Sequence, residues 1–275
     1  MFKIPRTFSY SSASTFKQCP RRWKHKYIDK LPDPTGEAAL VGTFAHDVLE
    51  QLCEEEAPLR TEAKAKEIAR KSWAEFAAKK DFIELELDEK SQNAFRWKTW
   101  EAIQGLWHLE DPATVAVEAT EQKLSTSLSG VPFFGIVDRL DRNEDGLTVV
   151  DYKTGKVHKD NIGQVLLYSA AVTSQTGEQP SKARLFYLGN NKVTPQIIET
   201  DVSENLIAKV VEDLSDTWNK LNDNLNREEF EPITTPLCGW CSFITECADG
   251  IEFIKEKASS GKLRSDAPAR SALGL

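Results

Sequence analysis

The sequence predicts an α/β protein in which helices flank a central mixed β-sheet. Stretches with strand-like patterns gather between residues 114 and 200, and stretches with helical periodicity precede, interrupt and follow them. Of the 275 residues, 40% are hydrophobic and 28% are charged, which is typical of a soluble globular protein with a substantial core. We expect one domain over residues 1–260, with a flexible tail over 261–275.

Helices are predicted along the first 110 residues. Ser11 or Ser12 is expected to cap a short helix in "FSYSSASTFKQC". Apolar residues recur at helical spacing in three longer stretches, which we read as helices over 38–56, 61–80 and 89–109. The last two form a helical insertion over 57–110. On the predicted helix over 38–56, Cys53 is expected to be a packed free thiol.

The sheet core is predicted over residues 111–200. Three strands are expected in "TVAVEATEQKL", "PFFGIVDRLD" and "GLTVVDYKT", separated by the turn signals "SLSG" and "RNEDG". A helix over 160–174 and strands in "KARLFYLG" and "KVTPQIIET" follow, and a helix over 203–224 comes after the sheet.

The stretch "TVVDYKTGK" carries the first chemical signal. Side chains alternate along a strand, so Asp151 and Lys153 are predicted to share one face while Tyr152 points to the other. Asp138 lies on the preceding strand, and a short turn brings both carboxylates to one end of the sheet. Two neighbouring carboxylates repel unless a cation lies between them, and Mg²⁺ prefers such oxygen ligands. The alternative is a structural Asp–Lys ion pair.

Two further features indicate a function only when they are considered together with these acids. His46 lies on the apolar side of its predicted helix, where a histidine is more often a core residue than a ligand. Gln164 and Tyr168 are four residues apart and therefore share a helix face.

Taken in order, these residues resemble the RecB-like branch of the PD-(D/E)XK nuclease superfamily. The resemblance covers residues 8–250 and implies a restriction-endonuclease-like core. It implies a DNA nuclease that uses Mg²⁺ or Mn²⁺, an exonuclease acting on single-stranded DNA or DNA ends. One alternative is a non-catalytic iron–sulfur or zinc DNA-binding module of a recombination or CRISPR-adaptation complex. Another is an RNA nuclease of similar chemistry.

The resemblance also implies roles for individual residues. The metal ligands would be His46, Asp138, Asp151 and the backbone carbonyl of Tyr152. The catalytic set would comprise Asp138, Asp151 and Lys153, with Gln164 and Tyr168 as accessory residues. Glu118 is expected to be an additional acid near the metal, and Glu121 competes for that role.

Four of the five cysteines form a separate pattern, with Cys19 far upstream of Cys238, Cys241 and Cys247. In a chain expected to be cytoplasmic, such cysteines indicate a metal centre rather than disulfides. Four thiolates suit Zn²⁺ or a [4Fe–4S] cluster. The arrangement resembles the iron–sulfur staple of the same superfamily, found in AddB and the CRISPR-associated nucleases, which implies [4Fe–4S]. Zinc stays the alternative.

The remaining expectations concern partners and location. Arg21, Arg22, Trp23 and Lys24 follow Cys19, and cations mixed with an aromatic ring suit single-stranded DNA. Alternatively, Trp23 is a core residue. The net charge of −8 excludes a globally basic protein that coats nucleic acid. No membrane-length apolar run and no signal peptide is seen, so we expect a cytoplasmic protein without a membrane partner.

Overall fold

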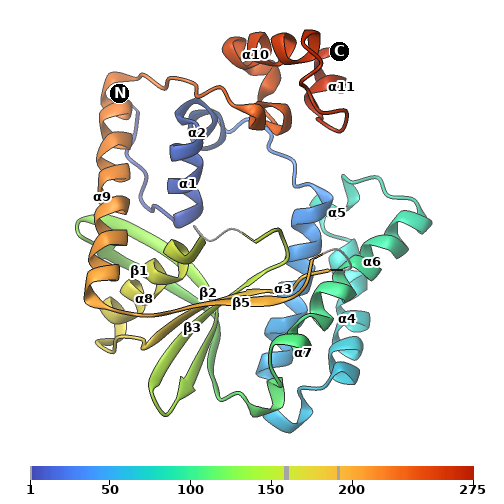
Figure 1. Cartoon of the computed structure of the whole chain (residues 1–275), viewed down its shortest axis with the longest axis vertical. Helices are drawn as coiled ribbons and strands as arrows, with labels where there is room; N and C mark the ends of the chain where they lie inside the picture. The colour runs from blue at the N-terminus through green and yellow to red at the C-terminus, as the bar shows by residue number, and fades with distance from the viewer. Residues whose placement is uncertain (1, 158–160, 191–192) are drawn as a thin grey trace. The chain divides into compact units, whose positions relative to one another are not determined.

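The computed structural model describes residues 2–157, 161–190 and 193–275 (Figure 1). They form two compact units. Thr35–Glu212 contains the sheet and is called the sheet unit below. Met1–Pro34 together with Asp213–Leu275 is called the terminal unit. No helix in the described part of the chain is long and apolar enough to cross a membrane.

Among the described residues, the sheet has five strands, which lie side by side in their sequence order. β3 and β4 are parallel and joined through α8, whereas every other neighbouring pair is antiparallel. The predicted mixed sheet of an α/β fold is therefore confirmed. The strands are β1 (Val117–Leu128), β2 (Val131–Asn143), β3 (Gly146–Lys153), β4 (Lys182–Tyr187) and β5 (Gln196–Asp201). The first residues of the predicted helix 160–174 and of the strand in "KVTPQIIET" lie outside the described residues.

Helices pack on both faces of the sheet (Figure 1). Val150 and Tyr152 of β3 belong to the core shared with α3, α4 and α6. Asp151, between them, points to the opposite face and meets a side chain of α8. The helices of this unit are α3 (Glu37–Glu54), α4 (Glu62–Ala77), α5 (Lys80–Ile83), α6 (Glu89–Gln104), α7 (Leu106–Leu109) and α8 (Ile162–Thr176).

One expected helix is interrupted. The stretch 89–109 forms α6 and α7, which meet at Gly105. A Cβ atom at Gly105 would lie 1.7 Å from the carbonyl oxygen of Leu188, so only glycine allows this approach of two backbones. We infer that this contact between Gly105 and Leu188 determines where α6 ends. The periodicity of the sequence does not contain information about such a long-range contact.

The terminal unit contains α1 (Tyr10–Gln18), α2 (Pro20–Tyr27), α10 (Ala248–Ser259) and α11 (Ala269–Leu273). The boundary between the units falls within α9 (Glu204–Arg227). Ser9 caps α1, in place of the expected Ser11 or Ser12, because its hydroxyl accepts the backbone N–H of Ser12. Residues expected in a flexible tail instead include α11 and the buried Leu263, Ala267 and Ala269, which pack around Ile254.

Candidate metal and catalytic site

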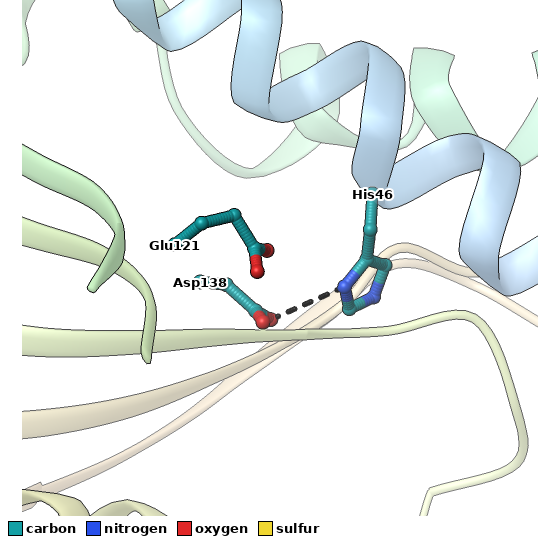
Figure 2. A group of neighbouring side chains, drawn as sticks. All are labelled: His46, Glu121 and Asp138. Atoms are coloured by element: carbon teal, nitrogen blue, oxygen red, sulfur yellow. Dashed lines mark ion pairs between the residues drawn. The ribbon is translucent and has the colours of Figure 1, made fainter. Parts of the chain in front are cut away.

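The side chains of His46, Glu121 and Asp138 converge at one end of the sheet (Figure 2). One donor atom from each lies within 4.8 Å of the others, and His46 Nδ1 is 3.5 Å from Asp138 Oδ2. They line a cavity of about 500 Å³, to which Tyr152 and Lys153 also contribute. An imidazole and two carboxylates in one cavity form a donor set suited to a divalent cation.

The last residues of β3 show the predicted alternation of side chains between the two faces of the sheet. The ammonium of Lys153 lies 2.6 Å from Asp151 Oδ2, so these side chains share a face. The hydroxyl of Tyr152 points to the other face and accepts a 2.7 Å hydrogen bond from Arg139. The backbone N–H of Tyr152 donates to Asp138 Oδ2 at 2.6 Å and thereby fixes the carboxylate of β2 against β3.

Gln164 joins the lysine, the buried acid and the tyrosine of α8. Its Oε1 accepts from Lys153 at 2.8 Å, and its Nε2 donates to Asp151 Oδ1 at 2.9 Å and to the Tyr168 hydroxyl at 2.7 Å. Tyr168 fits against β2 because Gly135 has no side chain: a Cβ atom there would lie 2.6 Å from the tyrosine ring. The predicted shared face of Gln164 and Tyr168 is therefore present.

Without a cation, the charges and the burial at this site favour the protonated forms of His46, Glu121 and Asp151. Burial would lower the pKa of His46, but the carboxylate of Asp138 outweighs it and raises that pKa to about 9. Burial, reinforced by Asp138, raises the pKa of Asp151 to about 6 and that of Glu121 to about 7. A divalent cation would displace these protons and relieve the repulsion between the carboxylates.

The extra acid beside the site is Glu121 and not the expected Glu118. Glu118 is 47% exposed and pairs with Arg142 outside the cavity. A bulge between Val117 and Ala119 shifts the strand register, and Glu121 has a positive φ of 43°. Regular strand alternation would place residues 118 and 121 on opposite faces of the sheet, but it does not tell which of the two faces carries the site.

The four cysteines of the predicted metal centre line one small cavity of about 40 Å³ in the terminal unit. Their sulfurs accept backbone N–H bonds: Arg22 and Ile233 donate to Cys19 at 3.5 Å. Thr235 donates to Cys238 and Gly250 donates to Cys247, each at 3.4 Å. Within the described residues, no three of these sulfurs lie within 4.8 Å of one another. The fifth cysteine, Cys53, is buried in the sheet unit as predicted.

The basic segment after Cys19 is largely occupied with internal contacts. Arg21 donates to the carbonyl of Phe230 at 2.7 Å, Arg22 to Gln18 at 2.9 Å, and Lys24 pairs with Asp29 at 2.8 Å. Trp23 is 1% exposed, and its ring stacks on Phe230. The prediction that Trp23 stacks on DNA bases is therefore wrong, and the alternative of a core residue holds.

Comparisons with known proteins agree with this geometry. The family model of the PD-(D/E)XK nuclease superfamily matches residues 7–248. A protein from Eubacterium rectale named "Putative exonuclease" is 16% identical, with 88% of this chain and 93% of that chain covered and a TM-score of 0.51. SSO0001 is 15% identical, with 91% and 89% covered and a TM-score of 0.40. No curated protein matches significantly. Because the family model spans most of the chain, the chain belongs to the PD-(D/E)XK nuclease superfamily.

Proposed function

We propose that this nuclease is a metal-dependent deoxyribonuclease that acts as an exonuclease on single-stranded DNA or DNA ends. One observation carries the proposal: His46, Glu121 and Asp138 meet in a cavity that Lys153 also lines. A structural ion pair would explain Lys153 and Asp151, but it would not explain why an imidazole and two further carboxylates gather beside it.

The donor set fits Mg²⁺ or Mn²⁺. Carboxylate oxygens suit both ions, and an imidazole nitrogen makes Mn²⁺ especially acceptable. We propose that the ligands come from His46, Asp138, Asp151 and the backbone carbonyl of Tyr152, with Glu121 as an additional acid. When bound, the cation would polarise the scissile phosphate and lower the pKa of the attacking water.

The residues around the cation site act by position and charge. The ammonium of Lys153 is held by Asp151 at 2.6 Å and by Gln164 at 2.8 Å, so it is fixed before a substrate arrives. There it can offset negative charge that develops on the phosphate oxygens. Tyr168 holds the amide of Gln164 in the orientation that this requires.

The test is cleavage of end-labelled single-stranded and double-stranded DNA with Mn²⁺. Asp151→Ala and Lys153→Ala should each lower the cleavage rate at least about 100-fold, since each removes a preorganised charge. Both should keep the circular dichroism spectrum and DNA affinity of the wild type. Lys182→Ala, which removes a surface pair with Glu199, is the matched control and should cleave normally. Full activity in either site variant, or a wild type that binds DNA but never cleaves it, would refute the proposal.

We further propose that Cys19, Cys238, Cys241 and Cys247 hold a [4Fe–4S] cluster. The four cysteines line one cavity, and the sulfurs of Cys19, Cys238 and Cys247 accept backbone N–H bonds, which suits thiolate ligands of such a cluster. Anaerobically purified protein should contain iron and absorb visible light, and Cys238→Ala should be colourless. Stoichiometric zinc without visible absorption would refute the cluster.

A further inference from the structure

A groove of about 550 Å³ lies on the helical insertion, outside the catalytic cavity. Its sides come from α4 and α6, and Phe44 of α3 contributes to its lining. Aromatic and basic residues dominate the two sides. They are Lys66, Arg70 and Trp73 on α4, and Arg96, Trp97 and Trp100 on α6.

The two helices present these residues as facing stripes. Positions 66, 70 and 73 are three or four residues apart on α4, and on α6 position 100 is four residues from 96 and three from 97, so these residues are neighbours on their helix surfaces. Cations and rings pair across the groove: Lys66 Nζ lies 4.8 Å from the centre of the Trp100 ring, and the Arg96 guanidinium lies 5.2 Å from that of Trp73. The groove therefore contains two cation–π pairs between its facing helices.

Core packing explains only part of this surface. Trp73 also contacts Phe44 at a ring-centre distance of 5.7 Å, and Trp73 and Trp100 both pack against the core. Trp97 does not, because it is 62% exposed. Its Nε1 donates to Glu101 at 2.9 Å, which orients the ring while its faces stay accessible. An oriented, exposed indole loses little conformational entropy when a flat group stacks on it.

The charge of the groove is opposite to that of the whole chain. The net charge is −8, yet no Asp or Glu is among the described residues that line the groove. A polyanion that carries flat groups matches such a surface, because its phosphates meet the cations and its bases stack on the indoles. An acidic protein segment would match the cations, but it would leave the row of indoles without an equivalent partner.

We infer that the groove between α4 and α6 binds single-stranded DNA, an inference that rests on the proposed function of this chain as a deoxyribonuclease. Phe44 and His46 are separated by about 200° around α3, so the groove and the metal site lie on different sides of that helix. The groove therefore anchors DNA away from the cleaved bond. It raises the affinity for longer strands and takes no part in the chemical step.

Fluorescence anisotropy with labelled oligothymidylate tests the inference, with EDTA present so that DNA is not cleaved. Trp97→Ala and Arg70→Glu should each weaken binding of a strand of about 30 nucleotides at least about fivefold. The slope of log K against log salt should fall by about 0.7 for Arg70→Glu. The controls are Ile83→Ala, another exposed apolar residue, and Lys71→Glu, the same charge change on the same helix outside the groove. Both should bind like the wild type.

Cleavage assays with Mn²⁺ then separate this inference from the nuclease proposal. The groove variants should raise KM on the long strand without lowering kcat, and they should cleave a strand of about 6 nucleotides like the wild type. A wild type that cleaves, with groove variants that match their controls in affinity and KM, would overturn the inference and point to a protein in the groove. A wild type that binds DNA through the groove but never cleaves it would instead refute the nuclease proposal alone.

Discussion

At the scale of single residues, Glu121 couples the candidate cation site to the pH dependence of stability. Its carboxylate shares the cavity with Asp138 and His46, and burial raises its pKa to about 7 from an ordinary value of 4.5. Between these two pH values the folded protein holds a proton that the unfolded chain has lost. The free energy of unfolding of the metal-free protein must therefore fall as the pH rises through this window.

Glu121→Gln should make that decline shallower, and the raised pKa values of His46 and Asp151 should account for what is left of it. Relative to the wild type, the metal-free variant should gain stability between pH 5 and pH 7.5, as measured by urea unfolding at several pH values. Glu118→Gln removes a carboxylate from the same strand outside the cavity and should follow the wild-type profile. Parallel profiles for Glu121→Gln and the wild type would show that Glu121 titrates normally and lies outside the electrostatic network of the site.

At the scale of elements, side-chain hydrogen bonds connect β2 and β3 beside the candidate site, where the described backbone pairing of these two strands ends. The described register of β2 with β3 begins at Arg139 and Val150, one residue beyond Asp138. From there Arg139, which is fully buried, donates to the hydroxyl of Tyr152 and to the carboxylates of Glu110 and Asp141. Arg139 thereby links side chains of β2 and β3 beside the candidate site, and we infer that it positions these two strands.

Tyr152→Phe tests this role because it removes one hydroxyl and leaves the backbone and the ring in place. Losing a hydrogen bond to a charged group should cost about 1.5–3 kcal/mol of stability. Mn²⁺ affinity and kcat should also fall severalfold, as measured by titration calorimetry and initial rates. Arg60→Met is the control, since Arg60 is also a buried arginine but bonds to backbone carbonyls remote from the cavity. It should lose stability without losing Mn²⁺ affinity, and equal losses in both variants would mean that Arg139 and Tyr152 are only structural.

Features of the structure that depend on local periodicity could be predicted from the sequence. Strand alternation placed Asp151 and Lys153 on one face, and helical spacing brought Gln164 to Tyr168. Prediction from the sequence failed where tertiary contacts decide. The bulge that separates Glu118 from Glu121, the close approach that ends α6 at Gly105, and the burial of Trp23 all arise between segments far apart in the chain.

At the scale of the whole molecule, each of the two units contains one inferred inorganic site. The cation site lies within Thr35–Glu212, and the cysteines lie within the terminal unit. Cys19 and Cys238 enclose the complete sheet unit in sequence, so a cluster that joins them would close a very long loop and reduce the entropy of the unfolded chain.

Thermal unfolding should therefore show two transitions that respond to different ligands. Mn²⁺ at about 100 times its Kd should stabilise the sheet unit by about 2.7 kcal/mol. Cys238→Ala should lower the transition of the terminal unit and leave the Mn²⁺-dependent shift of the sheet unit in place. Calorimetric scans with and without Mn²⁺ check this for both proteins. A single transition that moves with either change would instead mean that the units unfold together.

The glycine in the middle of β2 has a consequence that reaches the reaction centre. Tyr168 occupies the space that any larger residue at position 135 would need, and through its hydroxyl it contacts the amide that holds the lysine. One methyl group on this strand would therefore push the aromatic ring outward and propagate through two hydrogen bonds to the ammonium. Position 135 bears no reactive atom, yet the residue there would affect the orientation of Lys153, the proposed catalytic lysine.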